Sequence, residues 1–308
     1  MLKFEENFLM KRITTLQIGG PAKYFVIVKT ITQLTETVAY AREKNLPFIV
    51  IGGGSNLLVN DLGADCLVIK NETEGIVRNG HILTVQSGTI LQNLVNFSLF
   101  HGLFGLQKLT GIPGTVGGAV YGNAGAYGQT ISDFITEVYC FNGQKITTLP
   151  KKDCEFNYRD SGFKKNGYAI LEIKFQLQHE SPQILTSESK DILSKRLVKY
   201  PPGIRCPGSF FKNLIADTLS KEVLDKIPLD KIVYGKLPAG ALLEMVGAKG
   251  DSLDGIYIAD YHANLFINKD SGTADAFYKL AKKYAQLVKE RFGITLEPEV
   301  QLINLPPI

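Results

Sequence analysis

Two glycine-rich segments have the residue types and spacing to bind a phosphorylated ligand. GGGSN at residues 52–56 follows the apolar run Phe48–Ile51, where backbone N–H groups can turn outward and hold an anion. The second segment, TGIPGTVGGAVYGNAGAYG at residues 110–128, interleaves small residues with Thr, Asn and Tyr. A ribbon without Cβ atoms lets a large planar or phosphorylated molecule lie against the backbone. Two such segments in one chain indicate a large nucleotide cofactor.

Neither segment is a common nucleotide-binding fingerprint. The Rossmann pattern requires G-x-G-x-x-G at the start of a helix, but Leu57 occupies the sixth position and the residues after it read as strand or turn. No G-x-x-x-x-G-K-S/T occurs, which excludes a P-loop NTPase. Two ligand-free alternatives stay open at this stage: a tight turn at 52–56 and a packing ribbon between sheets at 110–128.

Cysteine and histidine supply no second kind of site. The cysteines show no CxxC and no paired spacing, so we expect reduced, mostly buried thiols instead of disulfides or a zinc site. The histidines have no H-x-x-x-H pattern and no acidic partner at metal-ligand spacing, so we expect no metal. These residues are Cys66, Cys140, Cys154, Cys206, His81, His101, His179 and His262.

Composition narrows the class of protein. The chain has 308 residues, of which 44% are hydrophobic and 21% charged, as in a soluble globular protein of two or three domains. A net charge of +4 is too small for a nucleic-acid-binding surface. No apolar run reaches the roughly 20 residues of a membrane helix, and Lys3, Glu5 and Glu6 stand where a signal peptide would be apolar. We expect a cytoplasmic protein without nucleic acid or membrane partners.

The elements before the first glycine segment predict a parallel βαβ unit. Residues 24–28 and Phe48–Ile51 read as buried strands. Between them, Thr30 and Gln33 form a capping box that opens a helix to about residue 45. The first glycine segment therefore lies at the end of the second strand.

Hairpins and helices surround the second glycine segment. Asn-Gly at 79–80 and at 142–143, each between two strand-like runs, predicts two hairpins with type I′ turns. Helices are expected over 89–101 and 182–199, and a strand over 169–178. The fold class of the whole chain reads as α+β with several small sheets, and Pro201-Pro202 is the best candidate domain boundary. We expect strands at 208–211, 256–258, 263–267 and 296–303, and helices at 219–226, 238–246 and 273–292.

Six motifs resemble, in the same order, those of one protein family. The chain is similar to the UDP-N-acetylenolpyruvoylglucosamine reductases, or UDP-N-acetylmuramate dehydrogenases, of bacterial cell-wall synthesis. The match spans nearly the whole chain. The motifs are TTLQIGGPA at 14–22, GGGSN at 52–56, GIPGTVGGAVYGNAGAYG at 111–128, YRDS at 158–161, GSFFKN at 208–213 and LEPEV at 296–300.

The resemblance implies a flavoprotein of three small domains. Residues 1–70 with 296–308 and residues 71–200 are expected to form an FAD-binding fold of the vanillyl-alcohol-oxidase type, also called PCMH type. Residues 201–295 are expected to form an α/β domain that binds a UDP-sugar. The implied cofactor is non-covalent FAD, with NADPH as co-substrate and UDP-N-acetylglucosamine enolpyruvate as the small-molecule substrate. We expect a monomer.

The resemblance also implies a reaction and three catalytic residues. NADPH reduces FAD, and reduced flavin converts the enolpyruvyl ether into the lactyl ether of UDP-N-acetylmuramate, through an enolate-like intermediate. By this resemblance, Arg159 and Glu299 stabilise the developing charge and Ser209 donates a proton. Glu299 can act there only if it is protonated or hydrogen-bonded so that it delivers a proton. Ser209 needs a hydrogen-bonded relay, for which the sequence offers no partner.

Further contacts follow from the same motifs. Lys212 and Asn213 resemble contacts to the substrate diphosphate or sugar, because a positive charge suits a diphosphate. The expected FAD contacts lie in the two glycine segments. They are Gly52, Gly53, Gly54, Ser55, Asn56, Thr110, Gly111, Gly114, Thr115, Gly118, Asn123 and Gly125.

The chain departs from the family pattern around GSFFKN. Leu214 follows the motif where Pro is more common, and Cys206-Pro207 precedes it where small residues are common. The stretch between Arg159 and Ser209 is short, as in the class that lacks an insertion with a substrate-covering Tyr. Two alternative functions stay open: an FAD-dependent oxidase that uses dioxygen, and a non-catalytic nucleotide-binding module. The three retained catalytic positions argue against the second alternative.

Overall fold

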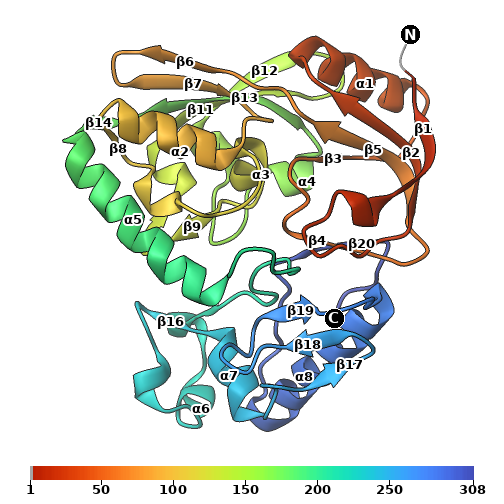
Figure 1. Cartoon of the computed structure of the whole chain (residues 1–308), viewed down its shortest axis with the longest axis vertical. Coiled ribbons are helices and arrows are strands. Elements are labelled where there is room, and N and C mark those ends of the chain that lie inside the picture. The colour runs from red at the N-terminus through yellow and green to blue at the C-terminus, as the bar shows by residue number, and fades with distance from the viewer. Residues whose placement is uncertain (1–2) are drawn as a thin grey trace. The chain divides into compact units, whose positions relative to one another are not determined.

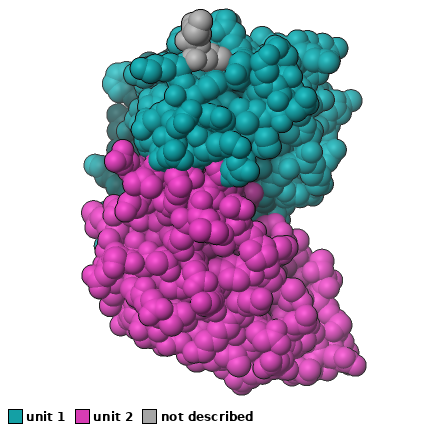
Figure 2. All heavy atoms as spheres, turned by 90° about the vertical axis from the view of Figure 1, so that its right-hand side faces the viewer, with its two compact units in different colours: residues 1–8, 22–53, 65–201 teal, residues 9–21, 54–64, 202–308 magenta. Residues whose placement is uncertain are grey.

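The computed structural model describes residues 3–308 and divides into two compact units (Figure 2). Unit 1 contains residues 1–8, 22–53 and 65–201, and unit 2 contains residues 9–21, 54–64 and 202–308. Each unit is therefore assembled from separate stretches of the chain. The expected division into three domains is finer than this, and its boundaries stay a prediction.

The first sheet of unit 1 has the strand order β1-β2-β5-β3 (Figure 1). Its strands are β1 (Glu5–Leu9), β2 (Pro21–Val28), β5 (Ala64–Asn71) and β3 (Phe48–Ile51), and α1 (Ile31–Glu43) connects β2 to β3. The predicted strand–helix–strand order is confirmed. β5 lies between β2 and β3, however, and it is β5 that pairs with β3 in parallel.

The start of α1 shows how the sequence fixes this connection. The Thr30 hydroxyl accepts the Gln33 N–H at 3.1 Å, as expected for a cap. The Gln33 side chain reaches one residue further back and accepts the Lys29 N–H at 2.8 Å. Leu34 and Val38 are fully buried on the apolar face. Capping and burial together hold α1 between the sheets of unit 1.

The second sheet of unit 1 has the order β12-β11-β13-β7-β6, and all neighbouring strands are antiparallel. Both predicted hairpins are present, as β6–β7 and β11–β12. Unit 1 also contains several short strands and a short helix. The five strands are β6 (Ile76–Asn79), β7 (Ile82–Gln86), β11 (Ile135–Phe141), β12 (Ile146–Pro150) and β13 (Ala169–Gln176), and the short elements are β8 (Leu103–Phe104), β9 (Gly125–Ala126), β10 (Gln129–Thr130), α4 (Phe163–Asn166) and β14 (Gln178–His179).

The type I′ prediction is wrong for both hairpin turns. Asn79 pairs with Ile82, so Gly80 is the first central residue, and its φ of +60° is the feature of a type II′ turn. The second hairpin has the four-residue loop 142–145, in which the Asn142 side chain accepts two backbone N–H groups. In neither hairpin, therefore, does Asn-Gly occupy the two central positions of a type I′ turn.

Helices cover the second sheet and form the main core of unit 1 with it. They are α2 (Leu91–Phe100), α3 (Val116–Tyr121) and α5 (Pro182–Lys199) (Figure 1). The short helix η2 (Gln107–Leu109) comes between α2 and α3 in sequence. Apolar side chains of these helices share one cluster with inward-facing residues of β7, β11 and β13. The expected helices at 89–101 and 182–199 are confirmed.

Unit 2 is built around a small antiparallel sheet and the long helix α8. The aromatic rings of Phe210, Phe211, Phe266 and Phe277 are fully buried in its core. A separate parallel pair joins β4 to the last strand, β20. The elements are β4 (Leu57–Val59), β15 (Leu214–Ile215), α6 (Lys221–Leu224), β16 (Lys236–Leu237), α7 (Ala239–Met245), β17 (Ser252–Leu253), β18 (Ile256–Ile258), β19 (Phe266–Asn268), α8 (Ala274–Phe292) and β20 (Gln301–Ile303).

The cysteines are free thiols, and three of the four are buried, as expected. Burial raises the pKa of Cys140 to about 11 and that of Cys154 to about 12, so neither is a ready nucleophile. Within residues 3–308, no group of His, Cys, Asp and Glu side chains could hold a metal ion. No helix in the same residues is both long and apolar enough to cross a membrane.

Candidate active site

The two glycine segments meet in unit 1. A Cβ atom added to Gly52 would lie 2.1 Å from Thr115 Oγ1, and one added to Gly53 would lie 2.9 Å from Gly114 Cα. Only glycine permits this approach of the backbone at residues 52 and 53 to the Thr115 side chain and the Gly114 backbone. The end of β3 is therefore packed against the start of α3. This packing brings the two predicted cofactor segments side by side.

A β-bulge holds α3 in place. Between β11 and β13 the register shifts at Tyr139/Cys140, which leaves Leu171 without a partner on β11. The Leu171 carbonyl accepts the Ser87 N–H at 2.9 Å, and the Ser87 carbonyl accepts the Gly117 N–H at 2.7 Å. Thr115 caps the helix by accepting the Gly118 N–H at 3.3 Å. The short helix α3 is thus held in place by hydrogen bonds that link it, through Ser87, to β13 of the sheet.

One face of α3 carries bare backbone. A Cβ atom added to Gly118 would meet only Thr115 Oγ1, at 3.5 Å, and one added to Gly122 only the Gly118 carbonyl, at 3.7 Å. These two glycines stand four residues apart, on one side of the helix, and Gly118 is exposed. Unlike Gly52 and Gly53, they are not required by contacts within the protein. A flat molecule fits such a surface.

Asn123 leaves a buried polar atom without a partner. Its side chain is 4% exposed, and its Nδ2 donates to the Asn157 carbonyl at 2.8 Å. Its Oδ1 has no hydrogen-bond donor among the described residues. Buried polar atoms in folded proteins are nearly always paired, so this oxygen fits a donor from a bound molecule. The φ of +43° at Asn123 holds the side chain in this place.

Arg196 in α5 is a candidate that the sequence analysis missed. Its Nε is buried and has no acceptor among residues 3–308, and its guanidinium lies 5.4 Å from the centre of the Tyr200 ring. A Cβ atom added to Gly111 would lie 3.2 Å from this Nε. Burial lowers the pKa of Arg196, and the charge of Arg159 lowers it further. A half-buried cation beside the glycine segment fits an anionic group.

Other predicted cofactor residues make contacts within the protein. The Thr110 hydroxyl lies 2.7 Å from the Gln107 carbonyl and 2.8 Å from Ser189 Oγ. The Gly111 N–H donates to the Gln92 side chain at 2.8 Å. These bonds tie the glycine segment to α2 and α5. Thr110 and Gly111 therefore hold the second glycine segment in place through contacts within the protein.

The first glycine segment spans both units. Gly54 begins its unit 2 part with a φ of +62°, and an added Cβ atom there would lie 2.0 Å from the Ile13 carbonyl. Asn56 Nδ2 donates to the Glu299 carbonyl at 3.1 Å. Ser55 lies between these two anchored residues. The bare face of α3, the open Asn123 oxygen and the Arg196 guanidinium together fit a large anionic cofactor such as FAD.

Arg159 occupies a strained backbone position in unit 1. Asn157 and Asp160 pair across a tight turn, with N···O distances of 3.0 and 3.2 Å, and Arg159 between them has a φ of +54°. Left-handed backbone is unusual for a long side chain, and such strain concentrates at functional sites. Arg159 Nη2 donates to the Gly125 carbonyl at 2.7 Å. Asp160 lies 3.6 Å from the Lys164 ammonium.

This strain predicts an unusual order of stability. We expect Arg159→Gly to be more stable than Arg159→Ala by about 1 kcal/mol, because only glycine adopts a positive φ without cost. Urea unfolding of the two variants measures the difference. The matched pair Lys282→Gly and Lys282→Ala, in the middle of α8, should show the opposite order. Equal stability of the two Arg159 variants would contradict the strain.

Ser209 and Glu299 lie on adjacent segments of unit 2. Ser209 forms an isolated antiparallel bridge with Leu265, and Phe211 forms one with Pro298. The Glu299 N–H donates to the Phe210 carbonyl at 2.7 Å. The backbone therefore brings two of the three predicted catalytic residues together, although they are distant in sequence. Arg159 belongs to the other unit.

The two predicted substrate contacts follow in the same segment. Lys212 Nζ lies 2.5 Å from Glu297 Oε1, and the Lys212 N–H donates to the Glu297 carbonyl at 2.9 Å. Asn213 Oδ1 accepts the Ala239 N–H at 3.2 Å. Both side chains are thus held by neighbours in unit 2. A substrate diphosphate would have to share Lys212 with Glu297.

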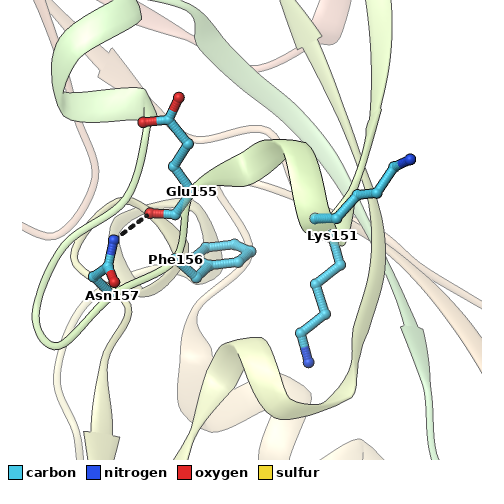
Figure 3. Close-up of a pocket in the computed structure, with 5 residues that line it drawn as sticks. Lys151, Glu155, Phe156 and Asn157 are labelled. Atoms are coloured by element: carbon cyan, nitrogen blue, oxygen red, sulfur yellow. Dashed lines mark hydrogen bonds between the residues drawn. The ribbon is translucent and has the colours of Figure 1, made fainter.

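A shallow cavity of about 660 Å³ lies in unit 1 and is partly lined by Asn157, from the turn that contains Arg159 (Figure 3). Its lining consists of Lys151, Lys152, Glu155, Phe156 and Asn157, and Asn157 Nδ2 donates to the Glu155 carbonyl at 3.3 Å. None of the predicted site residues lines it. We therefore assign it no part in the active site.

Comparison with known proteins agrees with this geometry. Residues 22–144 match the family model described as FAD binding domain, and residues 201–303 match the model described as UDP-N-acetylenolpyruvoylglucosamine reductase, C-terminal domain. These matches confirm the predicted FAD-binding fold and the C-terminal domain. FAD is therefore the cofactor of this protein.

Whole-chain relatives point the same way. The UDP-N-acetylenolpyruvoylglucosamine reductase of Solibacter usitatus is 40% identical over 94% of both chains, and that of Thermotoga maritima is 33% identical over 94% of this chain and 95% of its own. The crystal structure of the reductase from Thermus caldophilus superposes with a TM-score of 0.78 at 28% identity, over 98% of this chain and 99% of its own. The chain therefore belongs to the family of UDP-N-acetylenolpyruvoylglucosamine reductases.

Proposed function

We propose that this protein reduces the enolpyruvyl ether of UDP-N-acetylglucosamine to UDP-N-acetylmuramate at the expense of NADPH. The observation that carries the proposal is the pairing of the Ser209 and Glu299 segments in unit 2. An acidic group and a hydroxyl on neighbouring backbone segments suit a reaction that needs both charge stabilisation and a proton. Membership of the family supports the same substrate.

Bound FAD would supply the hydride chemistry that links NADPH oxidation to reduction of the enolpyruvyl double bond. The protein's own residues hold the cofactor and control the charge and the proton. The bare face of α3 at Gly118, the Asn123 oxygen and the Arg196 guanidinium are the groups that fit it best. The 52–56 segment supplies backbone N–H groups for phosphate.

Each catalytic residue has a distinct role in this proposal. Arg159 binds the substrate carboxylate through its fork of N–H donors and holds the charge that develops beside it. Glu299 stabilises the charge that develops on the substrate during reduction. Ser209 gives its proton to the carbon that does not receive hydride. Lys212 and Asn213 bind the diphosphate or sugar of the substrate.

The proposal also covers the domain division, the cellular location and the oligomeric state of the protein. Residues 1–70 with 296–308, 71–200 and 201–295 act as three domains, the first two for FAD and the third for the UDP-sugar. The protein works as a cytoplasmic monomer. Size-exclusion chromatography with light scattering tests the last point, since a dimer would double the mass.

The central experiment is spectroscopic. We expect the purified protein to be yellow, and NADPH oxidation to depend on UDP-N-acetylglucosamine enolpyruvate. A colourless protein that FAD cannot reconstitute would contradict the proposal. Rapid reoxidation of reduced enzyme in air without the sugar would instead indicate an oxidase. Binding of FAD without any turnover would indicate a nucleotide-binding module.

The bare face of α3 predicts opposite effects of one substitution. Gly118→Ala should leave the FAD-free protein as stable as the wild type or more so, because Ala favours helix over Gly by about 1 kcal/mol and has room there. FAD affinity should fall, because the added methyl group covers the face. Fluorescence titration with FAD and thermal unfolding measure the two effects. An unchanged FAD affinity would place the flavin elsewhere.

A further inference from the structure

Asn264 makes an unusual pair of hydrogen bonds in unit 2. Its side chain is 2% exposed and binds both backbone groups of Phe211. Asn264 Oδ1 accepts the Phe211 N–H at 2.8 Å, and Nδ2 donates to the Phe211 carbonyl at 2.8 Å. The amide therefore takes the place of one residue of a neighbouring strand.

This amide continues a ladder that includes both catalytic segments of unit 2. The Asn264 carbonyl accepts the Phe210 N–H at 3.0 Å, and the Phe210 carbonyl accepts the Glu299 N–H at 2.7 Å. Ser209 pairs with Leu265 at the start of the same ladder. The segments that contain Phe210, Asn264 and Glu299 are thus hydrogen-bonded to one another at the residue that follows Ser209.

We infer that Asn264 is a positioning residue for Ser209 and Glu299. Both of its side-chain hydrogen bonds go to the Phe211 backbone. It fixes the backbone between them, so that the hydroxyl and the carboxyl group face the substrate with a constant relative placement. A displacement of about 1 Å at a reacting group can slow a reaction by about 100-fold. The inference rests on the proposed function, because it assigns Asn264 to the step in which substrate is reduced.

The test separates the two half-reactions by anaerobic stopped-flow absorbance of the flavin. We expect Asn264→Ala to leave reduction by NADPH within about twofold and to slow reoxidation by the enolpyruvyl sugar by about 100-fold. In a Ser209→Ala background, Asn264→Ala should slow reoxidation much less, because the hydroxyl that it positions is already absent.

The chain offers a matched control in Asn268. It is also 2% exposed, its Nδ2 donates to the Leu16 carbonyl at 3.0 Å, and its Oδ1 accepts the Gly272 N–H at 3.0 Å. Asn268→Ala should lower the melting temperature as Asn264→Ala does, without the selective loss of reoxidation. If Asn264→Ala does not fold, Asn264→Asp retains the acceptor for the Phe211 N–H and replaces the donor to the Phe211 carbonyl by an acceptor.

The outcomes distinguish this inference from the proposed function. Equal slowing by Asn264→Ala in the wild-type and Ser209→Ala backgrounds would overturn the positioning role, as would an effect equal to that of Asn268→Ala. A Ser209→Ala variant with normal reoxidation would overturn the proposed role of Ser209 instead. If Asn264→Ala slows reoxidation selectively, and slows it much less in the Ser209→Ala background, the result supports both the positioning role of Asn264 and the proposed role of Ser209.

Discussion

Ser209→Ala is expected to slow reoxidation of the reduced flavin by substrate by about 10²- to 10⁴-fold, the range that a general acid contributes. Reduction by NADPH should remain nearly unchanged, because no proton from Ser209 is used in that step. The backbone of Ser209 keeps its bridge to Leu265 in the variant, so the segment stays in place. Single-turnover stopped-flow absorbance measures both rates.

A second serine provides the control for this prediction. Ser252 in β17 is exposed and belongs to the same unit, so Ser252→Ala should leave both rates unchanged. If Ser209→Ala slowed both half-reactions equally, the hydroxyl would serve binding or folding and not proton transfer.

Glu299→Ala is expected to lower kcat/KM for the enolpyruvyl sugar by about 10²- to 10³-fold, as does removal of a donor from an oxyanion site. Glu299→Gln should retain more activity, because its N–H group can still donate to the developing charge. Two of the contacts that anchor this residue use its backbone and remain in both variants: its N–H donates to the Phe210 carbonyl, and its carbonyl accepts from Asn56 Nδ2. Steady-state kinetics at saturating NADPH gives the comparison.

Glu290→Gln is a suitable control for the loss of one negative charge. This residue is exposed on α8, where it accepts from Gln286 at 2.9 Å. Its substitution should leave kcat/KM unchanged. An equal loss in Glu299→Gln and Glu299→Ala would show that proton delivery, and not hydrogen bonding, is the essential role of Glu299.

Local sequence patterns predicted the elements better than their connections. Capping and apolar spacing gave α1, because both act within a few residues. The place of β5 between β2 and β3 depends on contacts between distant segments, which no local pattern encodes. The Asn-Gly turns were misassigned because strand register, not the dipeptide, decides which residues occupy the turn.

The sequence predicts site residues only where these form continuous motifs, and their roles stay predictions. Gly52 and Gly53 were identified as important, but the structure shows that close packing against the second glycine segment already requires them. Arg196 and Asn264 were missed for one shared reason. Each is an ordinary residue in its own segment, and its special environment exists only after distant segments have packed around it.

The division of unit 2 among separate stretches of chain has a consequence for synthesis on the ribosome. β4 pairs with β20, and Asn56 binds Glu299 across 243 positions of sequence. Domains usually fold as they emerge, starting from the N-terminus. Residues 9–21 and 54–64 must instead wait, with Leu16, Ile18 and Leu58 still uncovered, until the last residues have been translated. Premature termination anywhere before β20 therefore leaves an apolar early segment exposed to chaperones and proteases.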